Sequence, residues 1–147
     1  MKEQVKIRNP NDIGALMRTR AGKRQENFWV ITLDGAHYVI GVHHISKGLV
    51  NRAIVHPREV FYPAIKDNAS SIAVCHNHPS GSMSPSDEDN NITGRLEKAA
   101  YILGFNFLDH VIIGKGGRWF SYRQAGLLKG FGEMNGFDFA EYAAELG

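Results

Sequence analysis

Two histidines separated by one residue, His76 and His78, are followed along the chain by Asp89. Two imidazoles and a carboxylate are the usual protein ligands of a catalytic zinc ion, which keeps a fourth position open for water. These residue types therefore predict a metal site and, through the activated water, a hydrolase. A simpler interpretation stays open, in which the histidines are polar groups at a strand end and Asp89 only caps a helix.

The spacing of the histidines has a geometric basis. Residues 71–75 form a short apolar run of the kind expected for a buried strand. Side chains two residues apart on an extended chain point to the same side. His76 and His78 are therefore expected to converge where this strand ends.

The segment after the histidines predicts a turn and then a helix. Pro79 and Pro85 prevent either regular structure from continuing, and Ser84 and Ser86 are both plausible helix caps. Ser86 and Asp89 also have the spacing of a capping box. A helix that starts near residue 86 brings Asp89 back toward the two histidines.

The motif resembles that of a known family. Residues 76–89 are similar to the JAMM (MPN+) metalloprotease motif, which reads His-x-His, seven residues, Ser, two residues, Asp. The form His-Asn-His-Pro-Ser-Gly resembles the bacterial RadC-like JAB domain. The similarity continues upstream in residues 55–60, Val-His-Pro-Arg-Glu-Val, and downstream in residues 108–114, and it covers about residues 8–123.

The resemblance implies roles for the motif residues. His76, His78 and Asp89 are expected to bind Zn²⁺, and Ser86 to help hold the water or the developing oxyanion. Zinc in such a site lowers the pKa of bound water from about 15.7 to about 7, so that hydroxide attacks an amide near neutral pH. The expected reaction is hydrolysis of a peptide or isopeptide bond in a protein or peptide substrate.

The general base is less clear from the sequence. Family members carry a glutamate on an upstream strand, and counting back from Val-His-Pro-Arg-Glu places His43 and His44 where an acidic pair is expected. Either imidazole can act as a base, or one can add a fourth ligand and close the zinc site, or both are polar residues on a strand. Four other carboxylates could take the role, Glu26, Asp34, Glu59 and Asp109, but none sits where the family's glutamate does. Each also has a structural interpretation: Glu26 precedes the first strand, Asp34 makes a hairpin turn with Gly35, Glu59 is a surface charge on a helix, and Asp109 anchors a neighbouring loop.

Composition indicates one globular domain. The chain has 147 residues and a mass of 16.4 kDa, with 43% apolar and 22% charged residues, which is typical of a folded domain. No apolar run approaches the roughly 20 residues that span a bilayer, and the start lacks a signal-peptide core. The single Cys75 fits a reducing compartment and a buried core thiol, so we expect a cytoplasmic protein with no membrane contact.

Periodicity and turn residues predict the elements. In the first half of the chain we expect a helix over 13–20 capped by Asn11 or Asp12, strands over 28–33 and 37–44, and a helix that begins at Pro57. In the second half we expect a strand over 71–78, a helix from about residue 86 to Gly104, and a closing hairpin of strands 107–113 and 119–122. The expected apolar stripes comprise Val60, Phe61, Ala64 and Ile65 on one helix and Ile92, Leu96, Ala99, Ala100 and Leu103 on the other. This order predicts an α/β fold. The family implies a JAB/MPN-like (cytidine-deaminase-like) mixed sheet flanked by helices.

The two ends of the domain are also predicted. Residues 8–123 are expected to form the RadC-like JAB/MPN domain, and residues 124–147 a C-terminal extension with a short amphipathic helix. The apolar positions of that helix are Phe139, Tyr142, Ala143 and Leu146. This stripe is expected to dock on its own domain or on a second copy in a homodimer.

Two other function classes are open at this stage, and the first is nucleic-acid binding or a nuclease. Arg18, Arg20, Lys23 and Arg24 make a small basic cluster, and the RadC family has an association with DNA repair. A net charge of only +2 gives a weak electrostatic footprint for DNA, so a solvated helix end is the simpler interpretation. The third class is a metal-bound interaction module that has lost catalysis, which the missing upstream glutamate motivates.

Overall fold

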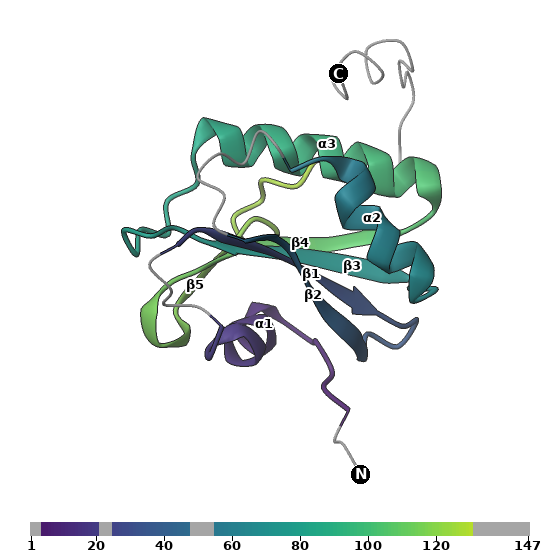
Figure 1. Cartoon of the computed structure of the whole chain (residues 1–147), viewed down its shortest axis with the longest axis horizontal. Helices are drawn as coiled ribbons and strands as arrows, with labels where there is room; N and C mark the ends of the chain where they lie inside the picture. The colour runs from purple at the N-terminus through teal and green to yellow at the C-terminus, as the bar shows by residue number, and fades with distance from the viewer. Residues whose placement is uncertain (1–3, 21–24, 48–54, 131–147) are drawn as a thin grey trace.

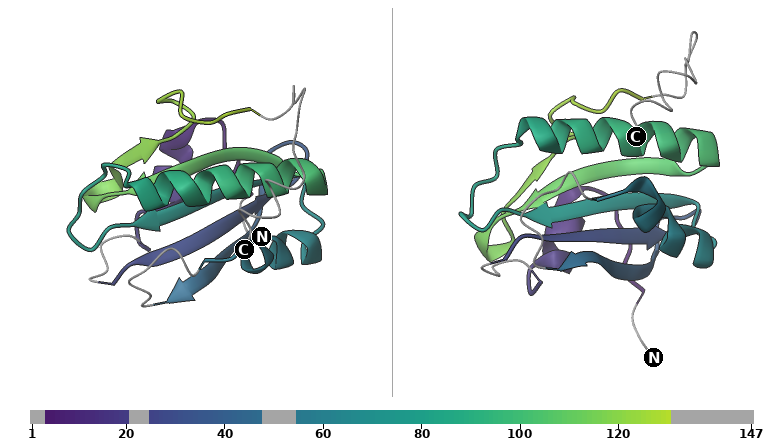
Figure 2. Two further views of the ribbon diagram at one scale, coloured as in Figure 1. Left: turned by 90° about the horizontal axis from the view of Figure 1, so that it is seen from above. Right: turned by 45° about the horizontal axis from the view of Figure 1, so that its top comes forward.

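The computed structural model describes residues 4–20, 25–47 and 55–130. Its helices and strands follow the chain in the order α1 (Pro10–Met17), β1 (Asn27–Leu33), β2 (Val39–Lys47), α2 (Pro57–Lys66), β3 (Ser71–Asn77), α3 (Asp87–Leu103), β4 (Asn106–Ile113), the 3₁₀ turn η2 (Lys115–Gly117) and β5 (Trp119–Ser121). The predicted α/β fold with a mixed sheet is confirmed. Helices α2 and α3 cover one face of the sheet and α1 covers the other (Figures 1 and 2).

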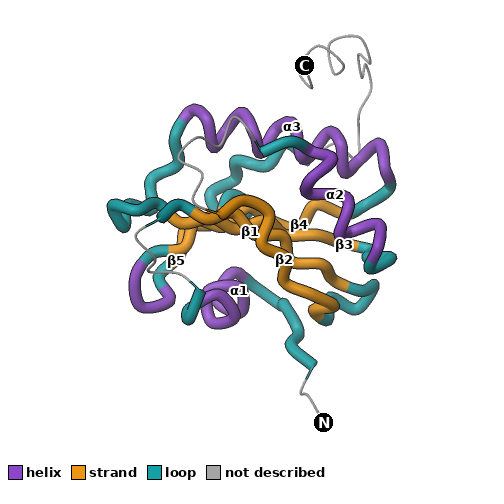
Figure 3. The backbone as a smooth tube through the Cα atoms, in the orientation of Figure 1, coloured by secondary structure: helices purple, strands orange, loops and turns teal. Residues whose placement is uncertain are grey.

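The strands form one sheet in the order β2-β1-β3-β4-β5. β1 is antiparallel to both β2 and β3, whereas β3 and β4 are parallel and β5 returns antiparallel to β4. A parallel pair needs a long crossover, and α3 supplies it between β3 and β4. The strands make a single layer between the helices (Figure 3). This topology places the end of β3 in the middle of the sheet, next to the start of α3.

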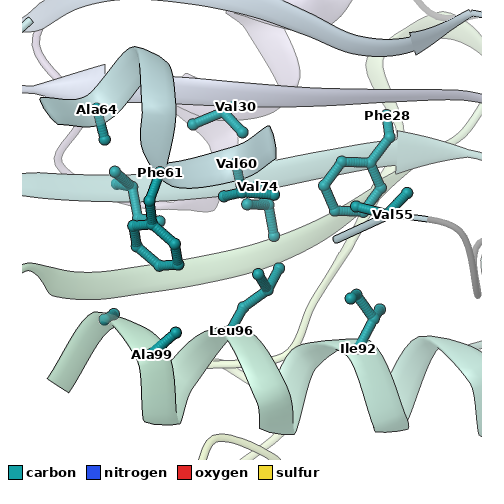
Figure 4. Packing of buried hydrophobic residues seen from close by; sticks show 12 residues of the cluster. Phe28, Val30, Val55, Val60, Phe61, Ala64, Val74, Ile92, Leu96 and Ala99 are labelled. Carbon is teal, nitrogen blue, oxygen red and sulfur yellow. The ribbon is translucent and has the colours of Figure 1, made fainter. Parts of the chain in front are cut away.

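Alternation along the strands divides the buried side chains into two cores. On the α2 and α3 face, Phe28 and Val30 of β1 and Val74 of β3 pack against Ile92 and Leu96 of α3 (Figure 4). On the α1 face, the buried set comprises Ile7, Ile13, Met17, Trp29, Ile31, Leu33, Ala73, Cys75, Val111 and Ile113. Every residue of β1 and β3 is buried, as expected for strands covered on both faces. The prediction that the Cys75 thiol lies in the core is confirmed.

Helix α1 starts earlier than predicted. Its cap is Asn9, whose side chain accepts a hydrogen bond from the backbone of Asp12, and neither Asn11 nor Asp12 is the cap. Pro10 occupies the first helical position, where its missing N–H costs nothing and its fixed φ suits the helix. The helix ends at Met17 rather than near residue 20.

Two residues of the predicted apolar stripes are exposed instead. Val60, Phe61 and Ala64 of α2 are buried, but Ile65 is 60% exposed. Each helical step turns the side chain by about 100°, and Ile65 is one step beyond the face that meets the sheet. Leu103 is 52% exposed in the last turn of α3, before the helix ends at the left-handed Gly104.

Some predictions lie outside the described residues. The C-terminal apolar stripe falls within residues 131–147, and Lys23 and Arg24 fall within residues 21–24. Among the helices that are described, none combines the length and the apolar character needed to cross a bilayer.

Candidate metal centre

The end of β3 and the first turn of α3 bring the three predicted ligands together. The Nε2 atoms of His76 and His78 lie 3.0 Å apart. Asp89 places Oδ1 3.0 Å from Nε2 of His76 and Oδ2 3.1 Å from Nε2 of His78. The side chains of His76 and Asp89 are fully buried and that of His78 is 12% exposed. Ligands about 2.1 Å from one tetrahedral ion are about 3.4 Å apart, so these atoms are close to that spacing.

The turn after β3 orients His78. Gly81 has a positive φ of 81° and its N–H donates to the carbonyl of His78, which closes the turn. The Nδ1 atom of His78 is 2.8 Å from the carbonyl oxygen of Ser82. Because a carbonyl only accepts, Nδ1 carries the proton and the lone pair of Nε2 faces the cluster.

Ser86 and Asp89 form a complete capping box at the start of α3. The Ser86 hydroxyl accepts from the backbone N–H of Asp89 at 3.1 Å, and the Ser86 backbone N–H donates to Oδ2 of Asp89 at 2.8 Å. The cap interpretation of these two residues is therefore correct as geometry. It does not compete with the ligand interpretation, because the cap holds the Asp89 carboxylate between the two histidines. The role of Ser86 toward water or an oxyanion stays a prediction.

Glu26 is a second carboxylate at the same site, although the sequence did not place it there. Carboxylate and imidazole atoms of Glu26, His76 and His78 all lie within 4.8 Å of one another, a grouping that could hold a metal ion. Glu26 is only 7% exposed. The strand register explains this position: Phe28 pairs with His76, so two residues further along the antiparallel strands Glu26 comes opposite His78, on the same face.

His43 and His44 do not join this cluster. β2 lies on the far side of β1 from β3, and the two adjacent histidines point to opposite faces. His43 places Nε2 2.6 Å from Oδ2 of Asp67, at the end of α2. His44 stacks on Trp29 with its ring centroid 5.6 Å away. The structure therefore does not bring these histidines to the cluster, where Glu26 is the carboxylate beside His76 and His78; a catalytic role for His43 or His44 stays a prediction.

The other three carboxylates have the structural roles that the sequence suggested. Asp34 accepts from the backbone N–H groups of Ala36 and Tyr38 in the hairpin turn. Glu59 is exposed on α2. Asp109 accepts from the Ser121 hydroxyl and from the backbone N–H of Arg123, so it anchors the segment that follows β5; burial raises its pKa.

Two residues of the site were missed as such by sequence reasoning, His110 and Thr93. His110 pairs with Val74 in the parallel ladder and faces the same side as His76, with its Nε2 2.7 Å from Nδ1 of His76. Its own Nδ1 lies 2.5 Å from the hydroxyl of Thr93 on α3. The sequence presented His110 only as part of a family-like stretch, and the strand pairing that brings it to the site is not local.

The fold and the candidate site together indicate the class of protein domain. A mixed five-stranded sheet with α3 as the crossover carries a His-His-Asp cluster with a buried glutamate beside it, which is consistent with a JAB/MPN-like domain. A family model described as the RadC-like JAB domain matches residues 7–127. The chain belongs to the RadC-like JAB domain family, and the resemblance seen in the motif is confirmed.

Curated relatives support the same assignment. A UPF0758 protein from Clostridium kluyveri is 45% identical over 127 residues, which cover 86% of this chain and 55% of that protein. A UPF0758 protein from Clostridium novyi is 49% identical over 109 residues, 74% of this chain and 48% of that protein. One from Methanospirillum hungatei is 47% identical over 117 residues, 78% of this chain and 52% of that protein. The chain spans about half the length of the curated relatives it matches.

Proposed function

We propose that this domain is a zinc-dependent hydrolase that cleaves peptide or isopeptide bonds. The observation that carries the proposal is the convergence of His76, His78 and Asp89 beside the buried carboxylate of Glu26. Membership in the RadC-like JAB family supports it, while the names of the relatives state no activity.

The donor set fits zinc. Two imidazole nitrogens and a carboxylate are borderline ligands of the kind that zinc takes in catalytic sites. The lone pair of His78 Nε2 faces Oδ2 of Asp89 at 3.1 Å, and two acceptor atoms at this distance are stabilised by a cation between them. When bound, zinc would lower the pKa of a water molecule and polarise the scissile carbonyl.

Glu26 is the general base of the proposed reaction. Its carboxylate lies beside the two histidines and Glu26 is 7% exposed, so it is placed to take the proton of the attacking water. It then delivers this proton to the amine as the C–N bond breaks. Water and amide are thereby converted to a carboxylate and an amine. The Phe28 ring, stacked on His76 with centroids 6.1 Å apart, gives the site an apolar wall.

The structure changes the support for one of the alternative functions. The interaction module without catalysis was motivated by a missing glutamate, and the position of Glu26 beside the histidines makes it a candidate for that role. DNA association, a homodimer and a cytoplasmic location stay predictions.

The experiment compares Glu26→Gln with the wild type and with Glu59→Gln, an exposed control on α2. Zinc content is measured by mass spectrometry on untagged protein, and cleavage is followed on fluorogenic peptides, in one mixture with peptide bonds and in another with lysine isopeptide bonds. We expect one zinc per chain in all three proteins and at least a 100-fold loss of cleavage in Glu26→Gln only. Wild-type protein that takes up no metal would exclude the proposal, and full cleavage by Glu26→Gln would exclude this base.

A further inference from the structure

We propose that Thr93 and His110 are positioning residues that fix the tautomer of His76, so that its Nε2 carries no proton and is ready to bind a metal. The inference rests on the proposed function, because it concerns how one ligand of the proposed zinc site is made ready to bind the ion. It concerns a chain of hydrogen bonds behind the cluster, which runs from the backbone of α3 through β4 to β3.

A backbone carbonyl at the α3 end of this series of hydrogen bonds determines which atom donates in each bond. The Thr93 hydroxyl lies 2.7 Å from the backbone carbonyl oxygen of Asp89 and 2.5 Å from Nδ1 of His110. A hydroxyl has one proton, and the carbonyl oxygen can only accept. The proton of Thr93 therefore goes to the carbonyl of Asp89. The oxygen of Thr93 is left to accept, so Nδ1 of His110 is the atom that carries a proton.

The proton position on His110 then determines the proton position on His76. A neutral imidazole with its proton on Nδ1 has a lone pair on Nε2, and Nε2 of His110 is 2.7 Å from Nδ1 of His76. His76 must donate this bond, which places its own proton on Nδ1. Its Nε2 is then bare, and this is the atom that faces His78 and Asp89 at 3.0 Å.

Burial of the two rings favours these hydrogen-bond directions over alternatives with water. His76 and His110 are both fully buried, which leaves little room for water to offer another partner. Tyr122 stacks on the ring of His110 with centroids 4.8 Å apart and an interplanar angle of 8°, and Phe28 meets the same ring edge-on at 5.9 Å. The two aromatic contacts hold the ring of His110 in the plane that the hydrogen bonds require.

The two candidate histidine ligands are thus prepared in different ways. His78 donates directly to a backbone carbonyl, whose polarity no side-chain substitution can change. His76 donates to another side chain, which could present either a lone pair or an N–H. The contacts of the Thr93 hydroxyl with the Asp89 carbonyl and with His110 select between these two states. Removal of such an orienting partner typically lowers metal affinity by about 10- to 100-fold.

The test uses Thr93→Val, which keeps the shape of the side chain but lacks the hydroxyl, and Thr93→Ser, which keeps the hydroxyl. Zinc affinity is measured on the full chain by competition with a chromophoric chelator. The tautomer of His76 is read in metal-free protein from the nitrogen chemical shifts of its ring. We expect an Nδ1 proton on His76 in wild type and Thr93→Ser, and a zinc affinity about 10- to 100-fold lower in Thr93→Val only.

Several results would overturn the inference. One is a neutral His76 whose proton lies on Nε2 in metal-free wild-type protein, and another is equal zinc affinity in the two folded Thr93 variants. If Thr93→Val does not fold, His110→Gln, whose amide oxygen can still accept from His76, replaces it and is compared with His110→Leu; equal zinc affinity of that pair also overturns the inference. Wild-type protein that binds no zinc would instead refute the proposed function, and the ring shifts would still decide the tautomer.

Discussion

Two pairs of histidines lie in the same sheet and have different surroundings. His76 and His78, separated by one residue at the end of β3, point to one face and meet Asp89. His43 and His44 are adjacent in β2 and point to opposite faces. In a strand, a spacing of two is what allows two side chains to share a site. The residue type alone therefore says less than the spacing does.

The acidic partners of the two pairs differ as well. The Asp89 side chain is fully buried between two imidazoles and is held by the cap of α3. The Asp67 side chain is 20% exposed and pairs with His43, which is 33% exposed. Solvent screens a partly exposed pair, so its contribution to stability is small. The first arrangement suits a metal ion and the second attaches β2 to the end of α2.

The largest expected effect is on metal content. His76→Ala removes a central candidate ligand, so zinc should fall from about one ion per chain to none, whereas His43→Ala should leave it unchanged. Mass spectrometry of both purified variants, with circular dichroism to establish folding, makes the measurement. Loss of zinc from folded His43→Ala would reverse the contrast drawn between the two pairs.

A smaller effect is expected at the cap of α3. Ser86→Ala removes the acceptor of the Asp89 backbone N–H, which should lower the free energy of unfolding by about 1 kcal/mol. Zinc affinity should fall with it, because the cap also positions the Asp89 carboxylate. Urea denaturation and chelator competition report the two quantities, with the exposed Ser84→Ala as the matched control. If Ser86→Ala loses stability and keeps full zinc affinity, the cap is only structural.

The smallest expected effect is the pH dependence of the Asp67 pair. The hydrogen bond from the Thr32 hydroxyl, at 2.6 Å, holds the pKa of Asp67 below its ordinary value, and His43 adds to this. A carboxyl whose pKa is lower in the folded state stabilises the fold above its unfolded pKa and loses that contribution as the pH falls. The difference in unfolding free energy between wild type and Asp67→Asn, below about 1 kcal/mol, should therefore shrink below about pH 4. A difference that stays constant from pH 7 to pH 3 would contradict this account.

The sequence predicted those parts of the molecule that depend on local pattern. The turn after His78, the start of α3 at Ser86 and its end at Gly104 all follow from proline, serine and glycine positions. Glu26 was considered but not placed at the cluster, and His110 was missed, because both reach the cluster through strand pairings between distant parts of the chain. The sequence placed Glu26 just before the strand 28–33, and neither the partner strand nor its register could be read from local pattern.

Adjacent residues of β3 serve opposite purposes. His76 faces the cluster, while the next side chain back, Cys75, is fully buried among apolar groups on the α1 face, where burial raises the pKa of its thiol. The candidate ligands themselves are only nitrogen and oxygen atoms. Thiol oxidation and alkylation, which strip metal from cysteine-ligated centres, therefore have no target in this one. A redox-inactive ion such as Zn²⁺ held by these atoms would therefore not be released by thiol oxidation.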